Sequence, residues 1–117
     1  MDHPIARTPA PPYWAVLFTS VRVDDDGRDY DRMAERLAEI APAQPGFLGI
    51  ESARDSSGVG ITLSYWADEG SIAAWKRQAL HLEAQRRGAA GWYADYALRV
   101  ARVERAYTGS DSTREGL

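Results

Sequence analysis

The spacing of apolar residues along positions 13–107 alternates between the period of a strand and the period of a helix, and this constrains the fold more than any other feature. Residues 13–23, "YWAVLFTSVRV", are nearly continuous in apolar character, as expected of a strand covered on both faces. The next segment has helical spacing, with apolar residues at Tyr30, Met33, Leu37 and Ile40. Residues 47–54 and 60–66 then flank "DSSG", and this arrangement predicts a β-hairpin.

A second helix is expected after the hairpin. Asp68 is a suitable N-cap, and Glu69 falls in the first turn, where a negative charge is favourable. One face of this helix is apolar throughout, with Ile72, Trp75, Ala79 and Leu82. Gly88 and Gly91 weaken its far end, so we expect a break or a second short helix before Tyr93.

Residues 96–107, "YALRVARVERAY", predict the last strand, and their alternation slips near Ala101, which indicates a bulge. The order β-α-β-β-α-β with right-handed crossovers predicts an α+β, ferredoxin-like fold, a four-stranded antiparallel sheet with both helices on one face. The first and last strands are apolar on the other face as well, and exposing that face to water is unfavourable. We therefore expect a homodimer in which the two sheets pack face to face.

Composition excludes several classes of protein. The 117 residues suffice for one domain, and they include no cysteine and only two histidines, so a disulfide is excluded and a metal site is not expected. The net charge of -3, without a basic cluster, argues against nucleic acid as a partner. No apolar run approaches the roughly 20 residues of a membrane span, and no signal-peptide pattern is present. We expect a cytoplasmic protein.

The two ends of the chain set the expected domain boundaries. Residues 1–12 are rich in proline, and residues 108–117, "TGSDSTREGL", are polar and contain glycine. Such segments lack the apolar residues that would dock them on a core. We expect a disordered tail at each end of a single domain at 13–107.

Two further sequence features resemble a known family. "PGFLGIES" after the first helix and "SYWADEGSIAAWK" at the start of the second are similar to segments of the antibiotic biosynthesis monooxygenase (ABM) superfamily. The resemblance covers about residues 13–107 and implies a dimeric α/β barrel. It leaves several functions open, because the superfamily includes cofactor-free oxygenases of polyketide phenols, haem-degrading enzymes, quinol oxygenases, isomerases of signal molecules and members with no known activity.

Our leading interpretation is a cofactor-independent monooxygenase that uses dioxygen to oxidise a small aromatic molecule, such as a phenol, a quinol or a polyketide-like ring. That chemistry requires a general base, a donor for the developing oxyanion and a dry aromatic pocket, and it requires no metal or cofactor. One alternative is a non-catalytic dimer that binds a small hydrophobic molecule or has a structural role. The other alternative is haem binding.

The haem-degrading branch uses an asparagine on the first strand, a tryptophan on the second helix and a histidine ten positions after that tryptophan. Trp75 matches the tryptophan, but the residue ten positions later is Gln85. The first strand offers Thr19 or Ser20, and the sequence contains no asparagine. The resemblance to this branch is therefore incomplete, and haem degradation is disfavoured.

Two residues are candidate catalytic groups. His81 is the best general base by type, because histidine titrates near physiological pH. On an uninterrupted helix, His81 lies about a third of a turn away from the Trp75 stripe, so a half-exposed helix histidine is the alternative interpretation. Trp75 lies on the core stripe of the second helix, where the resemblance implies a cavity lining.

Six further residues are candidates for binding the substrate: Trp66, Tyr65, Trp92, Tyr93, Arg77 and Glu51. Trp66 and Tyr65 point to opposite faces of one strand, and periodicity does not tell which face is covered by the helices. Trp92 and Tyr93, together with Tyr96, either close the pocket or plug the end of the domain. Arg77 is either a solvated helix charge or a group that holds a phenolate or carboxylate.

Glu51 has two interpretations. Strand alternation places it on the same face as Phe47 and Gly49, where a buried carboxylate would have a raised pKa and act as a base. The alternative is an ion pair with Arg54 or with an arginine of a partner subunit.

Overall fold

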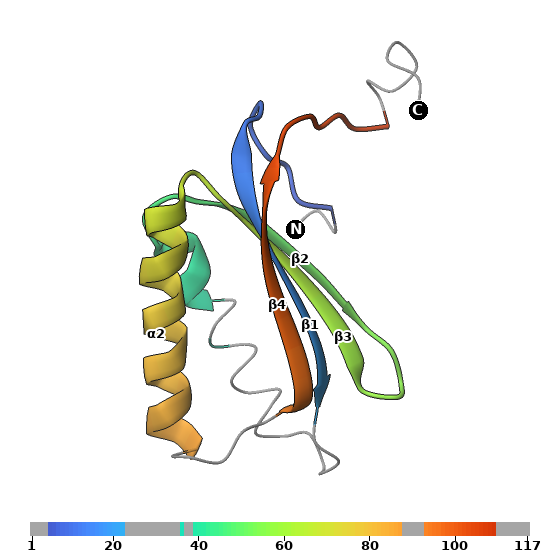
Figure 1. Ribbon diagram of the computed structural model, residues 1–117, viewed down its shortest axis with the longest axis vertical. Coiled ribbons are helices and arrows are strands. Elements are labelled where there is room, and N and C mark those ends of the chain that lie inside the picture. Colours follow the sequence, from blue (N-terminus) through green and yellow to red (C-terminus); the bar gives the residue numbers. More distant parts are fainter. Residues whose placement is uncertain (1–4, 23–35, 37–38, 88–92, 110–117) are drawn as a thin grey trace.

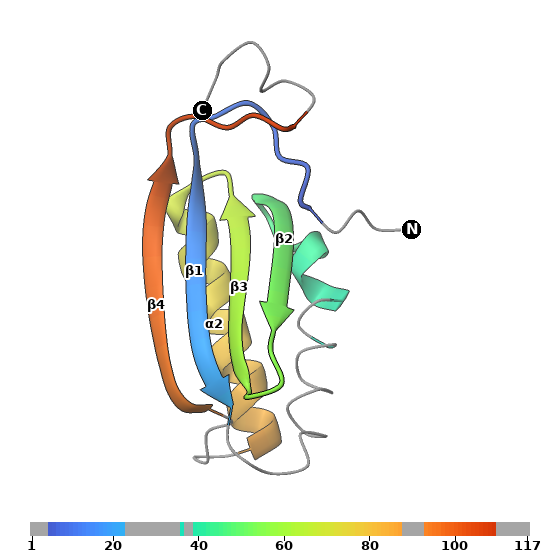
Figure 2. The same ribbon diagram turned by 90° about the vertical axis from the view of Figure 1, so that its right-hand side faces the viewer.

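Residues 5–22, 36, 39–87 and 93–109 are described in this computed structural model, with the backbone alone for residues 22, 79–87 and 93–95. This part of the chain forms the strands β1 (Tyr13–Arg22), β2 (Phe47–Arg54), β3 (Val59–Trp66) and β4 (Tyr93–Val103). The strands make one antiparallel sheet in the order β2-β3-β1-β4 (Figure 2). Helix α2 (Glu69–Arg87) and the short 3-10 helix η1 (Ala41–Ala43) lie on the same side of the sheet (Figure 1).

This arrangement confirms the prediction of an α+β, ferredoxin-like fold. The predicted hairpin, second helix, first strand and last strand occur with boundaries within a few residues of those expected, and α2 continues without a break to Arg87. Most of the expected first helix, including Tyr30, Met33 and Leu37, lies outside the described residues, although Ile40 is helical. The expected break near Gly88 also lies outside them.

The hairpin between β2 and β3 closes through a hydrogen-bonded turn. The Asp55 carboxylate accepts hydrogen bonds from the Ser57 hydroxyl (2.6 Å), the Ser57 N–H (2.9 Å) and the Val59 N–H (3.1 Å). These bonds, above all the one from the Ser57 hydroxyl, lower the pKa of Asp55. Gly58 has a φ of 95°, a conformation that glycine adopts without steric cost.

The bulge in β4 lies at the opposite end of the strand from the one predicted. The pairing with β1 is regular at Ala101, which faces Ala15, so the predicted slip there is wrong. The register shifts instead between Val21 and Arg22, which face Asp95 and Tyr93. Small and charged residues are mixed near Ala101, so the apolar alternation breaks there although the pairing with β1 stays regular.

The core lies between α2 and the end of β3. Val16, Trp66 and Ile72 are its buried members, and Trp14, Phe47 and Trp75 pack against them partly buried. The apolar stripe of α2 therefore faces the sheet at Ile72 and Trp75, as predicted.

No helix in the described ranges is long and apolar enough to cross a membrane.

Candidate active site

Three aromatic side chains from three elements meet at the start of α2. The rings of Trp66 and Trp75 are stacked, with centroids 5.8 Å apart and an interplanar angle of 29°. Phe47 meets Trp66 edge to face, with centroids 5.5 Å apart. Trp66 is completely buried, and its indole N–H donates a 2.9 Å hydrogen bond to the hydroxyl of buried Ser64. The aromatic cluster of Phe47, Trp66 and Trp75 is thus fixed by both packing and a satisfied polar group.

Local sequence explains why α2 returns over β3 at this point. The Asp68 carboxylate accepts a 2.7 Å hydrogen bond from the Ser71 N–H, which caps the helix as predicted. That bond, followed by the interaction with the Ser71 hydroxyl, lowers the pKa of Asp68. The Ala67 N–H donates to the Gly46 carbonyl at 2.8 Å, so the connection between β3 and α2 is tied to the turn before β2.

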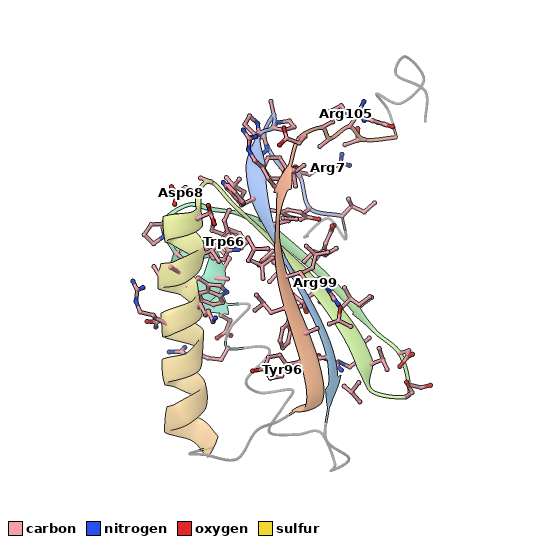
Figure 3. The ribbon with its side chains drawn as sticks, viewed as in Figure 1. Arg7, Trp66, Asp68, Tyr96, Arg99 and Arg105 are labelled. Atoms are coloured by element: carbon pink, nitrogen blue, oxygen red, sulfur yellow. The ribbon has the colours of Figure 1, made fainter. Side chains whose placement is uncertain are left out.

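The surface of the sheet that faces α2 continues from the aromatic cluster toward the far end of the strands. Across β3 and β1, Ser64 faces Val16, Thr62 faces Phe18, and Gly60 faces Ser20. On β4 the same rows end at three exposed apolar residues, Val100, Leu98 and Tyr96. Figure 3 shows the Tyr96 side chain on the side of the sheet where α2 lies, and its ring contacts Phe18 with centroids 5.7 Å apart.

The outer face of the sheet, on the other side from α2, carries a separate group of hydrogen-bonded residues. The Tyr65 hydroxyl donates a 2.6 Å hydrogen bond to Glu51, and the other Glu51 oxygen accepts a 2.9 Å bond from the Ala6 N–H. The ring of Tyr13 packs edge to face on Tyr65, and its hydroxyl is 2.7 Å from that of Thr8. Burial, followed by the hydrogen bond and the charge of Glu51, raises the pKa of Tyr65 well above its ordinary value.

The position of Glu51 corrects one expectation. A register shift between Phe47 and Gly49 changes which face these residues occupy, so Phe47 pairs with Trp66 while Gly49 pairs with Tyr65. Glu51 is therefore on the outer face with Gly49 and is separated by the sheet from Phe47. Arg54 points to the α2 side, so Glu51 makes its contacts with Tyr65 and Ala6 instead of Arg54.

The candidate residues thus separate into two groups and several isolated positions. Trp66 and Trp75 are brought together on the α2 side, whereas Tyr65 and Glu51 are brought together on the outer face. Arg77 is exposed on α2. The remaining candidates are known by backbone at most: position 81 lies on the continuous α2, Tyr93 begins β4, and Trp92 is outside the described residues.

Three side chains of the α2-facing surface were not among the candidates from the sequence: Trp14, Phe47 and Ser64. Trp14 and Phe47 both pair with Trp66 across the sheet, which no local pattern reveals. Ser64 was two positions before Trp66 on the same strand face, and this spacing was an available signal for a hydroxyl near the indole. In the described part of the chain, no group of three or more His, Cys, Asp or Glu side chains is arranged to hold a metal ion.

The fold and the aromatic cluster define a small ferredoxin-like protein with an aromatic site between helix and sheet, and sequence comparison identifies its family. Residues 16–87 match the family model described as antibiotic biosynthesis monooxygenase. The match covers more than half of the chain, and the chain belongs to this family.

Two curated relatives and one solved structure are similar to this chain. The chain is 42% identical over 111 residues to the uncharacterized protein YqjZ of Bacillus subtilis, covering 95% of this chain and 96% of that protein. It is 37% identical over 54 residues to the jasmonate monooxygenase ABM of Pyricularia oryzae, covering 46% of this chain and 25% of that protein. The fold is similar to that of a mutant of SnoaB, a cofactor-independent oxygenase from Streptomyces nogalater, with a TM-score of 0.62 at 12% identity over 80% of this chain and 95% of that one.

Proposed function

We propose that this protein is a cofactor-independent monooxygenase that oxidises a small aromatic molecule with dioxygen, and that the substrate binds between α2 and the sheet. The observation that carries the proposal is the stacked pair of Trp66 and Trp75 on the α2 side. Trp66 is fully buried against Trp75, so the partly buried Trp75 indole is the one that can meet a flat ring, because aromatic rings pack favourably in stacked and edge-to-face arrangements. Membership of the family and the likeness to a cofactor-independent oxygenase support the reaction type.

The proposed reaction draws its electrons from the substrate. A phenol or hydroquinone loses a proton, and the electron-rich ring carbon transfers an electron to dioxygen. The two radicals join in a carbon–oxygen bond, and the peroxide takes up a proton. Loss of the hydrogen on the same ring carbon as a proton then breaks the O–O bond and leaves a ring carbonyl and water. The protein must supply a base, a donor for the peroxide oxygens and the exclusion of bulk water.

The roles of the individual residues are part of the proposal. Trp75 contacts the ring and the buried Trp66 supports Trp75 from the core, while His81 takes the phenolic proton from its position further along α2. Arg77, Trp92 and Tyr93 contribute further contacts to the substrate. Tyr65 and Glu51 act on the outer face, where we place the contact with a second subunit, so their contribution to substrate binding is indirect.

We also propose a homodimer through the outer face of the sheet. Ile61, Val59 and Val21 are exposed there, and covering them would remove apolar surface from water. A cytoplasmic location remains a prediction from the sequence.

Oxygen uptake tests the proposed reaction. We expect the purified protein, in chelator-treated buffer, to consume dioxygen with anthrone or with a hydroquinone. Trp75→Ala should reduce the rate at least about tenfold, and Trp75→Phe should retain part of it because a ring remains. His81→Ala should reduce the rate and change its pH dependence.

The control is Lys76→Ala, which alters an exposed side chain next to Trp75 on the same helix and should leave oxygen uptake unchanged. If neither Trp75→Ala nor His81→Ala changes the rate, the site is elsewhere. If the wild-type protein binds these aromatics without consuming dioxygen, the family fold serves here as a binding module.

A further inference from the structure

Ser64 is a buried hydroxyl group at the polar edge of the aromatic cluster. It lies on the α2 side of β3, two residues before Trp66, and is only 6% exposed. Its Oγ accepts the 2.9 Å hydrogen bond from the Trp66 indole N–H. A hydroxyl group has one O–H to donate and two lone pairs with which to accept, so this bond does not use the Ser64 O–H.

The Ser64 O–H is a buried donor in need of an acceptor. In the part of the chain whose side chains are described, no acceptor for it is found. Its neighbours in the same row of the sheet, Val16 on β1 and Ile50 on β2, have no polar side-chain atoms. Buried polar groups are nearly always hydrogen-bonded, because an unpaired one costs free energy. A bound molecule can supply the acceptor.

The surface around Ser64 changes from closed to open along the strands. Trp66, on one side of Ser64, is completely buried. In the next row on the other side, Thr62 and Phe18 are half-buried, and Leu98 on β4 is 41% exposed. Successive residues on one face of a strand are roughly 7 Å apart, so Ser64 borders directly on this row. The hydroxyl is therefore at the inner end of a mainly apolar surface that suits a flat ring.

Trp66 holds the Ser64 hydroxyl in position and strengthens it as a donor. The indole N–H occupies one side of the Ser64 oxygen, so the O–H points elsewhere. A hydroxyl that accepts a hydrogen bond is polarised and donates its own proton more strongly. Because Trp66 is packed against Trp75 and Phe47, this position of the donor is set before any ligand binds. Trp66 is thus a positioning residue for Ser64.

We propose that the Ser64 hydroxyl donates a hydrogen bond to an oxygen attached to the ring of the bound aromatic molecule. This inference rests on the proposed site between α2 and the sheet. A phenolate oxygen and a ring carbonyl are both acceptors, and a donor fixed where negative charge resides stabilises that charge. The ligand class is thereby narrowed from small aromatics to aromatics that carry an acceptor oxygen on the ring.

Isothermal titration calorimetry with 1-indanone and indane tests this role, because the two molecules share a two-ring skeleton and only the ketone has an acceptor oxygen. Ser64→Ala should weaken binding of 1-indanone about fivefold, the loss expected for one hydrogen bond between neutral groups, and leave binding of indane unchanged. The affinity for indane also reports whether the variant retains its fold. A wild-type protein that does not bind 1-indanone overturns the proposal.

Infrared difference spectra of bound 1-indanone give an independent readout. A carbonyl group that accepts a hydrogen bond absorbs at a lower frequency than one in a hydrocarbon solvent, so the frequency should rise in Ser64→Ala. If that variant does not fold, Ser64→Cys, whose thiol is a weak donor, should show the same change. A wild-type frequency equal to that in a hydrocarbon solvent would overturn the proposal.

Ser20→Ala is the matched control. Ser20 is also buried on the α2 side, at 2% exposed, and its hydroxyl also accepts a hydrogen bond, from Arg54. It faces Gly60, which is four residues or roughly 13 Å from Ser64 along β3, so its loss should change neither affinity nor the carbonyl frequency. Equal weakening of ketone and hydrocarbon by Ser64→Ala would show that Ser64 only supports the packing of Trp66, and would overturn the proposal.

These measurements do not depend on turnover. A protein that consumes no dioxygen, but whose Ser64→Ala variant loses affinity for 1-indanone alone, contradicts the proposed reaction and supports the role of Ser64. A protein that consumes dioxygen with hydroquinones, and whose Ser64→Ala variant binds 1-indanone as the wild type does, gives the converse result.

Discussion

Gly46 and Ser71 are in such close contact that a Cβ at residue 46 would lie 2.0 Å from the Ser71 Oγ and 2.6 Å from its Cβ. Gly46 also has a φ of 79°, and the Phe47 N–H donates a 3.2 Å hydrogen bond to the Gln44 carbonyl across Pro45 and Gly46. Proline followed by glycine with positive φ is the signature of a type II turn. This turn holds the start of β2 against the first turn of α2, next to the aromatic cluster.

We therefore expect Gly46→Ala to lower the free energy of unfolding. The left-handed conformation alone costs a residue with a side chain about 1–2 kcal/mol, and the contact with Ser71 adds to this cost. Urea unfolding measures the loss. Adding Ser71→Gly should restore the part of the lost stability that is due to the contact and leave the part that is due to the backbone conformation. Gly70→Ala is the control, because its Cβ would meet only the Asp68 carboxylate, at 3.4 Å, and it should not destabilise the protein. A fully stable Gly46→Ala protein would contradict the turn geometry.

The Asp68 cap predicts a dependence of stability on acid pH. Its pKa is lowered in the folded protein, chiefly by the hydrogen bond from the Ser71 N–H, relative to 3.8 in the unfolded chain. The ionised cap therefore stabilises the fold fully above pH 3.8, and this contribution is lost as the pH falls through the folded pKa. Asp68→Ala should lower the melting temperature by a few degrees at pH 7 and by less at pH 3. Asp68→Asn, which keeps an acceptor, should retain most of the neutral-pH stability without the acid dependence.

The pair of Tyr65 and Glu51 predicts a dependence at alkaline pH. The pKa of Tyr65 is raised above the unfolded value of 10.0 by burial and by Glu51, so the folded protein keeps the phenolic proton that the unfolded chain releases. The contribution is complete below pH 10 and is lost as the pH rises further. Urea midpoints at pH 8 and pH 11 should show a smaller alkaline loss for Tyr65→Phe than for the wild type.

The same substitution should cost about 1–2 kcal/mol at pH 8, because it removes a hydrogen bond to a carboxylate. Tyr107→Phe, at an exposed position on the chain after β4, is the control and should keep the alkaline loss of the wild type. An unchanged alkaline loss in Tyr65→Phe would indicate that other groups cause it.

The proposed homodimer predicts a specific effect at Ile61, which is 47% exposed on the outer face. Ile61→Lys places a charge in the proposed contact and should convert the protein to a monomer in sedimentation velocity experiments at micromolar concentration. Gln78→Lys adds the same charge to an exposed position of α2 and should leave the association state unchanged. A wild-type protein that sediments as a monomer would contradict the proposal.

The sequence by itself determined the order of the described elements, because each depends on neighbours in the chain. The alternation of residues 60–66 and the "DSSG" turn predicted the hairpin, and Asp68 before an apolar stripe predicted the start of α2. The motifs around Phe47 and Trp75 also indicated the family. All of these signals lie within a few residues of the structure they specify.

Only the tertiary structure decided which face of the sheet each candidate residue occupies. Alternation separates Trp66 from Tyr65 but is symmetric with respect to inside and outside, and the choice depends on where α2 packs. The register shift after Phe47 then places Glu51 on the opposite face of the sheet from Phe47. A bulge is a property of the pairing between two strands, so its position cannot be inferred from one strand alone.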